Sequence, residues 1–112
     1  MKILQNYING QWVDSNCEAT INVVNPATQE VLARVPFGED TRKDIDTAVA
    51  AAHEAYLEWK NVPVLRRIQP LFKLKQLLEE NREEISRLIT LECGKTLAES
   101  NGEIQRAVEN VE

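Results

Sequence analysis

Glycine, cysteine and histidine are scarce in this chain of 112 residues. The four glycines (Gly10, Gly38, Gly94 and Gly102) lie far apart, so neither the GxGxxG spacing nor the P-loop spacing of a phosphate-binding loop occurs. Cys17, Cys93 and His53 are too few and too widely separated to form a four-ligand zinc site. The ordinary composition favours free thiols in a reducing compartment, with a Cys17–Cys93 disulfide as the alternative.

Positive charge and long apolar runs are also lacking. Thirteen basic and eighteen acidic residues give a net charge of −5, which repels phosphate backbones and anionic lipids. No apolar run approaches the roughly 18 residues of a membrane span, and the chain becomes polar too early for a signal peptide. These features predict a cytoplasmic protein that binds neither nucleic acid nor membrane.

The sequence does contain enough hydrophobic residues, 43%, for an ordinary folded chain. Residues 1–40 predict two β-hairpins. Asn9-Gly10 tolerates the positive φ angles of a type I′ turn, and Asn25-Pro26-Ala27-Thr28 forms a turn between two β-branched stretches. Trp12 and Trp59 are expected to act as packing anchors for the first hairpin and the first helix.

Residues 41–112 predict about four helices, because the apolar period changes to 3.6 residues. The first begins at a Thr41–Asp44 capping box and ends before Pro63; its apolar face holds Ile45, Ala48, Val49, Ala52 and Tyr56. The second spans about residues 64–81, where Pro70 either kinks the helix or marks its effective start.

Three helix-end signals delimit the last two predicted helices. The third runs from Asn81 to Gly94 with Ile85, Leu88 and Ile89 inward, and the fourth opens at a Thr96–Glu99 capping box with Leu97, Ile104, Ala107, Val108 and Val111 on one face. Strands followed by helices form an α+β pattern. Because the last periodic pattern reaches Glu112 without a stop signal, residues 1–112 are expected to be an incomplete domain, with hairpins in 1–40 and helices in 41–112.

Several stretches, taken in order, resemble the aldehyde dehydrogenase superfamily. The stretches are Asn6-Tyr7-Ile8-Asn9-Gly10-Gln11-Trp12-Val13, Val24-Asn25-Pro26-Ala27-Thr28-Gln29-Glu30-Val31, Ala48-Val49-Ala50-Ala51-Ala52, Arg66-Arg67, Leu91-Glu92-Cys93-Gly94-Lys95 and Gly102-Glu103-Ile104. The resemblance implies that the chain is an N-terminal segment at the periphery of the NAD-binding domain of that α/β fold.

The final stretch narrows the resemblance. Gly102-Glu103-Ile104-Gln105-Arg106, followed by Val108-Glu109-Asn110-Val111-Glu112, is most similar to the methylmalonate-semialdehyde dehydrogenase branch. The resemblance implies a homo-oligomeric parent enzyme that oxidises methylmalonate or malonate semialdehyde to an acyl-CoA, with NAD and coenzyme A, through a cysteine nucleophile. The family's nucleophile, oxyanion asparagine and NAD-ribose lysine lie beyond residue 112. No catalytic, cofactor-binding or metal residue is therefore assigned here, and the segment alone is expected to be inactive.

Arg106 is the one candidate site residue. A semialdehyde that carries a carboxylate requires a fixed cation, and a guanidinium binds a carboxylate through two parallel hydrogen bonds. The alternative is an ordinary helix-surface ion pair with Glu103 or Glu109. Cys93 is interpreted as a structural thiol because it lies at the negative end of a helix dipole, and Lys95 is expected to neutralise free carbonyls at that end.

A function of another class is also open. The apolar faces of the last two helices fit a free-standing helical interaction module derived from the same family, which docks a partner chain or a second copy.

Overall fold

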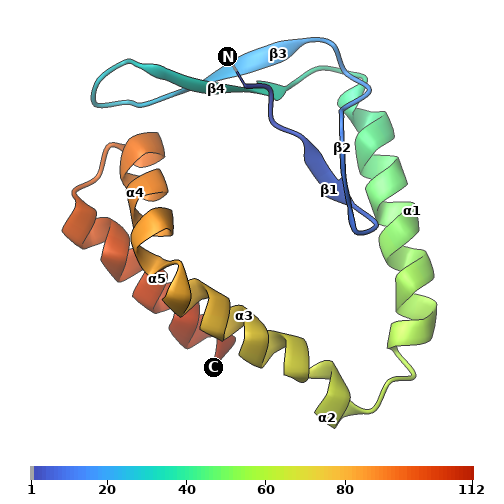
Figure 1. Cartoon of the computed structure of the whole chain (residues 1–112). Coiled ribbons are helices and arrows are strands. Elements are labelled where there is room, and N and C mark those ends of the chain that lie inside the picture. The colour runs from blue at the N-terminus through green and yellow to red at the C-terminus, as the bar shows by residue number, and fades with distance from the viewer. Residues whose placement is uncertain (1) are drawn as a thin grey trace. The chain divides into compact units, whose positions relative to one another are not determined.

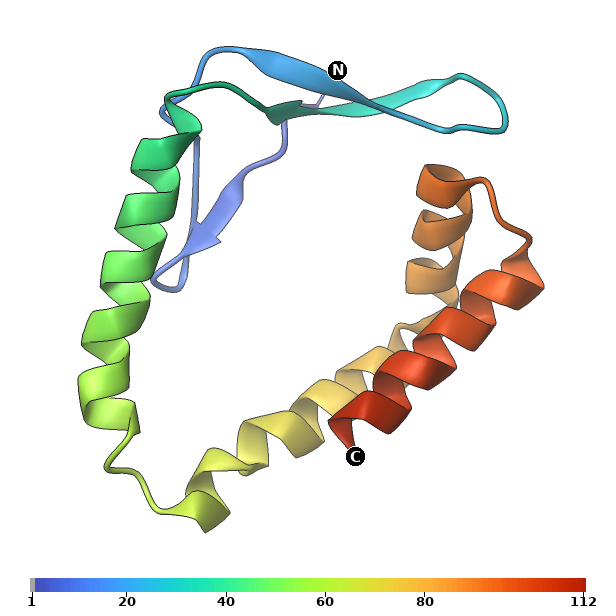
Figure 2. The ribbon, with the colours of Figure 1, turned by 180° about the vertical axis from the view of Figure 1, so that it is seen from behind.

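A computed structural model describes residues 2–112 and divides the chain into two compact units. The first unit comprises the residues up to Val24 together with Val31–Asn61, and the second comprises Asn25–Glu30 and Val62–Glu112. Figure 1 labels the helices and strands of both units, and Figure 2 shows the ribbon from behind. Strands precede helices throughout, which confirms the α+β prediction. In the described part of the chain, no helix combines the length and apolar character needed to cross a membrane.

Both predicted hairpins are present, and their four strands lie in the first unit. Strand β1 (Asn6–Ile8) pairs antiparallel with β2 (Gln11–Val13), and β3 (Thr20–Val24) pairs antiparallel with β4 (Val31–Pro36). Asn9 and Gly10 adopt φ angles of 50° and 77°, as the type I′ prediction requires. Asn25 shapes the second turn, because its side-chain oxygen accepts a hydrogen bond from the Ala27 amide at 2.9 Å.

Helix α1 (Thr41–Trp59) begins where the sequence predicts, but the capping box is wrong. Asp40 occupies the N-cap position without a side-chain cap, and the Thr41 hydroxyl donates to the Gly38 carbonyl at 2.6 Å. Asp44 turns away from the helix end towards the loop after β2. The capping box does not form because Ser15 and Asn16 in that loop donate several hydrogen bonds to the Asp44 carboxylate.

The predicted apolar face of α1 is present, but the first unit by itself does not bury it. Val49 is 62% exposed and Ile45 59% exposed. Trp12 and Trp59 are 67% and 45% exposed, so the prediction that they are packing anchors is wrong for this chain. The ring of Trp12 packs against that of its cross-strand partner Tyr7, with ring centroids 5.1 Å apart.

In the second unit, the structure decides between the two alternatives for Pro70. A short helix, α2 (Val64–Arg67), ends at Ile68, and α3 (Gln69–Glu80) then begins with Pro70 in its first turn. Proline is tolerated at that position because the first amides of a helix have no intrahelical acceptor. The predicted second helix is therefore two helices that meet at Ile68.

Helices α4 (Arg82–Cys93) and α5 (Leu97–Val111) lie side by side in both views (Figures 1 and 2). Their contact buries small and branched side chains: Ser100 is fully buried, Ile104 is 3% exposed and Val108 is 2% exposed. Leu88 and Leu97 are about half exposed, so the prediction that these two side chains belong to the inward faces of the helices is wrong.

The ends of these helices largely follow the sequence. Gly94 ends α4 with a φ of 69°, and the Thr96–Glu99 capping box opens α5, as predicted. Asn81 occupies the N-cap of α4, but its side chain donates backwards to the Leu77 carbonyl at 2.8 Å and does not cap. The Asn81 side chain therefore satisfies a backbone carbonyl near the end of α3 and leaves the first amides of α4 uncapped.

Candidate functional site

Helix α5 carries Arg106 on the side of the helix that faces away from its buried stripe. Ser100, Ile104 and Val108 recur every four residues and form that stripe. Arg106 follows Ile104 by two residues, about 200° around the helix, and its side chain is 61% exposed. The guanidinium is therefore accessible.

A second contact fixes the orientation of α5. The hydroxyls of Thr90 in α4 and Ser100 in α5 lie 2.8 Å apart in a hydrogen bond. Ser86, one turn before Thr90, is 2% exposed and its hydroxyl has no partner in the described residues. The small side chains of Ser86 and Ser100 permit close approach of the two helices, which holds the Arg106 face in a defined direction.

Arg106 belongs to a group of three charged side chains. Its terminal nitrogen NH2 lies 2.7 Å from Oε1 of Glu103, and the Lys95 Nζ lies 2.5 Å from the same oxygen. Arg106 first and Lys95 second lower the pKa of Glu103 to about 2, through hydrogen bonds and charge attraction. Glu103 in turn raises the pKa of both Lys95 and Arg106. All three groups are charged at neutral pH.

The surroundings leave part of the guanidinium open. Gly102 lies one helical turn before Arg106, and the nearest atom to a Cβ placed on Gly102 would be NH1 of Arg106, at 3.9 Å. Glu109, one turn after Arg106, accepts a hydrogen bond from Gln105 at 3.0 Å. The NH1 side of Arg106 therefore faces a part of the helix without a side chain.

This geometry corrects one interpretation and leaves another as a prediction. Lys95 pairs with Glu103, not with the free carbonyls at the end of α4, so its predicted role is wrong. The ion pair between Arg106 and Glu103 is present, whereas binding of a substrate carboxylate by Arg106 stays a prediction. The Arg106–Glu103 pair follows from i, i+3 spacing on a helix. No local rule links Lys95, just before the α5 cap, to Glu103 two turns into the helix, so the third member of the group could not be predicted from the sequence.

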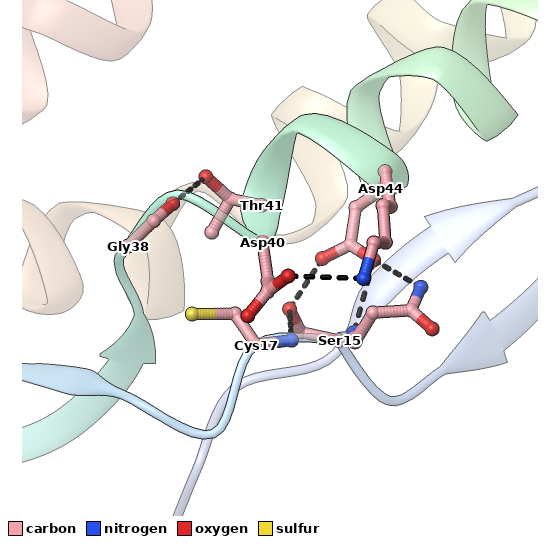
Figure 3. A network of polar contacts seen from close by, with 8 residues as sticks. Ser15, Cys17, Gly38, Asp40, Thr41 and Asp44 are labelled. Atoms are coloured by element: carbon pink, nitrogen blue, oxygen red, sulfur yellow. Dashed lines mark hydrogen bonds and ion pairs between the residues drawn. The ribbon is translucent and has the colours of Figure 1, made fainter.

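A separate polar network in the first unit joins the loop after β2 to α1 (Figure 3). Asp44, 8% exposed, accepts hydrogen bonds from the Ser15 hydroxyl and from the Asn16 amide at 3.0 Å. The Asn16 side chain also donates to Asp44, at 2.7 Å. Ser15 and then Asn16 hold the pKa of Asp44 below its ordinary value. These hydrogen bonds connect the loop after β2 to helix α1 and stabilise the position of that loop.

The described cysteines and acidic residues form no cluster that could hold a metal ion. Cys17 is buried and Cys93 is exposed, and both are free thiols. Among residues 2–112, no three His, Cys, Asp or Glu side chains are placed to hold a metal ion. Cys93 is the last residue of α4, and its role as a structural thiol stays a prediction.

The start of helix α1 is unfavourable for a phosphate group. Within residues 2–112, the connection from β4 to α1 is the one place where a strand leads into a helix. Its helix start carries Glu39, Asp40 and Asp44, whose negative charges oppose a phosphate. The expectation that this chain holds no cofactor-binding residue stays a prediction.

Comparison with known proteins relates these features to a family. The model of the aldehyde dehydrogenase family matches residues 12–112. The chain is 55% identical over all 112 residues to malonate-semialdehyde dehydrogenase 1 of Geobacillus thermodenitrificans, and it spans 23% of that relative's length.

Solved structures agree with this match. The methylmalonate-semialdehyde dehydrogenase of Oceanimonas doudoroffii is 40% identical, with a TM-score of 0.91 over 99% of this chain and 22% of that protein. Aldehyde dehydrogenase C of Pseudomonas syringae, solved as a mutant with NAD⁺ and octanal, is 35% identical, with a TM-score of 0.90 over 96% of this chain and 22% of that protein. The chain belongs to the aldehyde dehydrogenase family.

Proposed function

We propose that this chain is part of an NAD-dependent enzyme that oxidises malonate or methylmalonate semialdehyde to an acyl-CoA. The similarity to malonate- and methylmalonate-semialdehyde dehydrogenases supports the substrate class. In the overall reaction, the aldehyde carbon gives a hydride to NAD⁺, the coenzyme A sulfur bonds to that carbon, and the thiol proton is released. The chain spans about a quarter of its relatives' length, and the nucleophile, the NAD site and the coenzyme A site are assigned to the remainder of the enzyme.

Within this enzyme, we propose that Arg106 binds the carboxylate of the semialdehyde. The observation that carries the proposal is the exposed guanidinium on α5, which has one nitrogen engaged by Glu103 and its NH1 side open beside Gly102. A guanidinium can donate two parallel hydrogen bonds to a carboxylate, which distinguishes a semialdehyde from an uncharged aldehyde.

The test is Arg106→Ala in the complete purified enzyme, assayed by NADH formation with coenzyme A. We expect the KM for malonate semialdehyde to rise roughly 10- to 100-fold, because a charged hydrogen-bonding partner of the substrate is lost. The KM for propanal, which has no carboxylate, should change little. Equal effects on both substrates would contradict the assignment of Arg106, and the absence of any NADH formation by the unaltered enzyme would contradict the proposed activity.

The exposed apolar surfaces favour a second candidate, the free-standing interaction module. Large hydrophobic side chains lie exposed on α1 and α3, including Val49 and Phe72 at 62% and 64%. In the proposed enzyme, the remainder of the chain and neighbouring subunits of a homo-oligomer cover these surfaces. A purified 112-residue chain that is inactive, folded and self-associated in sedimentation experiments would favour the module. A monomer with little dye-accessible apolar surface would contradict it.

The composition supports a cytoplasmic location and small-molecule substrates for the proposed enzyme. A net charge of −5 opposes association with nucleic acids and anionic membranes. Fractionation of cells that express the tagged protein would test the location directly.

A further inference from the structure

We propose that Glu103 and Lys95 are positioning residues for Arg106: Glu103 holds the guanidinium in place, and Lys95 cancels the charge that Glu103 brings. This inference rests on the proposed role of Arg106 and goes beyond it by naming the residues that prepare the cation for its ligand. One oxygen atom joins the three residues, because Oε1 of Glu103 accepts hydrogen bonds from both Lys95 and Arg106.

Glu103 orients the guanidinium of Arg106. An arginine side chain has many rotamers, and fixing it before the ligand arrives lowers the entropy cost of binding. Glu103 lies one turn before Arg106 and contacts NH2 at 2.7 Å. The contact is on NH2, whereas NH1 lies beside Gly102. Glu103 therefore fixes one end of the guanidinium and leaves the other available to a carboxylate.

Lys95 offsets the negative charge that Glu103 places beside Arg106. A carboxylate next to Arg106 would by itself neutralise the guanidinium and weaken its attraction for an anionic substrate. Lys95 contributes a second positive charge 2.5 Å from Glu103, so the group of three keeps one net positive charge. Because the pKa of Glu103 is lowered to about 2, this balance is constant across the neutral range. Lys95 thus keeps the site attractive to a carboxylate while Glu103 orients it.

Nearby acidic residues do not replace Glu103. Glu109 attracts Arg106 through its charge and raises the pKa of Arg106 after Glu103 does, but its carboxylate accepts a hydrogen bond from Gln105 at 3.0 Å and forms no ion pair with the guanidinium. Asn110 donates to the backbone carbonyl of Arg106 at 2.7 Å and leaves the guanidinium untouched. In the described residues, Glu103 is the one carboxylate within ion-pair distance of Arg106.

The experiment compares Glu103→Gln and Lys95→Met in the complete purified enzyme, with malonate semialdehyde and propanal as substrates. We expect Glu103→Gln to raise the KM for the semialdehyde about fivefold, the scale of an exposed ion pair, with kcat and the propanal KM within about twofold of wild type. Lys95→Met should raise the same KM about threefold and weaken the decrease of kcat/KM with added salt.

Glu83→Gln is the matched control. Glu83 pairs with Arg87 at 2.6 Å on the exposed surface of α4, so the change removes a similar exposed ion pair that includes none of Lys95, Glu103 and Arg106. It should leave every kinetic parameter unchanged. A purely structural role of Glu103 would alter stability and both substrates together, without separating the semialdehyde from propanal.

Three outcomes overturn the inference. A semialdehyde KM that is unchanged in Glu103→Gln, while Arg106→Ala raises it, contradicts the positioning role alone and leaves the proposed function intact. A lower KM in Glu103→Gln shows that Glu103 competes with the substrate instead of preparing its site. An unchanged KM in Arg106→Ala removes the role of Arg106, and the inference fails with it. If Glu103→Gln does not fold, the salt dependence of Lys95→Met decides the question.

Discussion

Gly102 is a glycine in the interior of a helix, where alanine would be more favourable by about 0.5–1 kcal/mol. A Cβ at this position would meet no atom closer than NH1 of Arg106, at 3.9 Å, so packing in the described chain does not require glycine. Because Gly102 has no side chain, no side-chain atom of residue 102 lies beside the Arg106 guanidinium.

We therefore expect Gly102→Ala to stabilise α5 and to weaken substrate binding. The thermal midpoint should rise slightly, while the KM for malonate semialdehyde should rise about threefold because the added methyl group crowds the open side of Arg106. Calorimetry and steady-state kinetics on the same enzyme preparation measure the two effects. A lower thermal midpoint would show that another part of the enzyme packs against Gly102.

Asp44 predicts a specific acid sensitivity of the first unit. Its folded-state pKa lies below the ordinary value of 3.8 because Ser15 and Asn16 donate to the carboxylate. A lowered folded-state pKa stabilises the fold at pH values above 3.8, and this contribution is lost as the pH falls through the folded-state value. Stability should therefore decrease on the acid side.

Asp44→Asn should reduce stability at neutral pH and flatten this acid-side decrease. The measurement is the free energy of unfolding as a function of pH, from neutral to below the ordinary aspartate pKa. Asp46→Asn is the control, because Asp46 lies on the exposed surface of the same helix. Identical pH profiles for the two variants would contradict the role of the Asp44 network.

At the scale of elements, the break between α4 and α5 depends on Gly94. Its φ of 69° is strained for other residues, and a Cβ would lie 3.1 Å from the Pro26 side chain and 3.3 Å from that of Ala27. Gly10 has a similar φ of 77° but no atom within 4 Å of its Cβ position. An alanine at position 10 would therefore introduce backbone strain alone, whereas an alanine at position 94 would introduce both strain and steric crowding.

Gly10→Ala should cost about 1 kcal/mol through backbone strain, and Gly94→Ala about 2 kcal/mol because crowding adds to the strain. Denaturant unfolding of both variants under the same conditions measures the difference. Equal costs would show that the turn at Pro26 and Ala27 moves aside freely.

Local motifs predicted the elements well, and failures occurred where distant residues compete. Asn9-Gly10 and the Thr96–Glu99 capping box are short-range devices, and both form as expected. Asp44 leaves its predicted capping box because a loop 28 residues earlier in the sequence supplies donors. Hydrophobic periodicity identified the faces of the helices, but it could not show which part of each face another element covers. Lys95 was misassigned for the same reason, since its partner lies eight residues away.

At the scale of the whole molecule, each of the two units by itself buries few hydrophobic side chains. The buried hydrophobic residues in the described part are Cys17, Ile104 and Val108, whereas Ile45 and Val49 of α1 are exposed. A stable protein seldom leaves such a face in water, so we expect the remainder of the proposed enzyme to cover it.

The substitution Val49→Asp tests whether the apolar face of α1 is buried in the complete enzyme. In the complete enzyme it should destabilise the fold by more than about 2 kcal/mol, because it would bury an unpaired charge. His53→Asp, on the same helix but off the apolar stripe and exposed, should have little effect. The thermal midpoints and soluble yields of the two variants provide the measurement. If Val49→Asp is as well tolerated as His53→Asp, the face of α1 stays in water and the proposed cover is wrong.

The three-residue connection from Gly94 to Thr96 also has a consequence for the order of folding. Contacts between helices joined by so short a loop are local in sequence, and local contacts form fastest during folding, on timescales of about microseconds to milliseconds. The α4–α5 hairpin should thus be an early folding unit, with amides that become protected from hydrogen exchange before those of the long-range pairings. Lys95, Glu103 and Arg106 all lie within or beside this hairpin, so the charged group would be assembled before the rest of the enzyme closes around it.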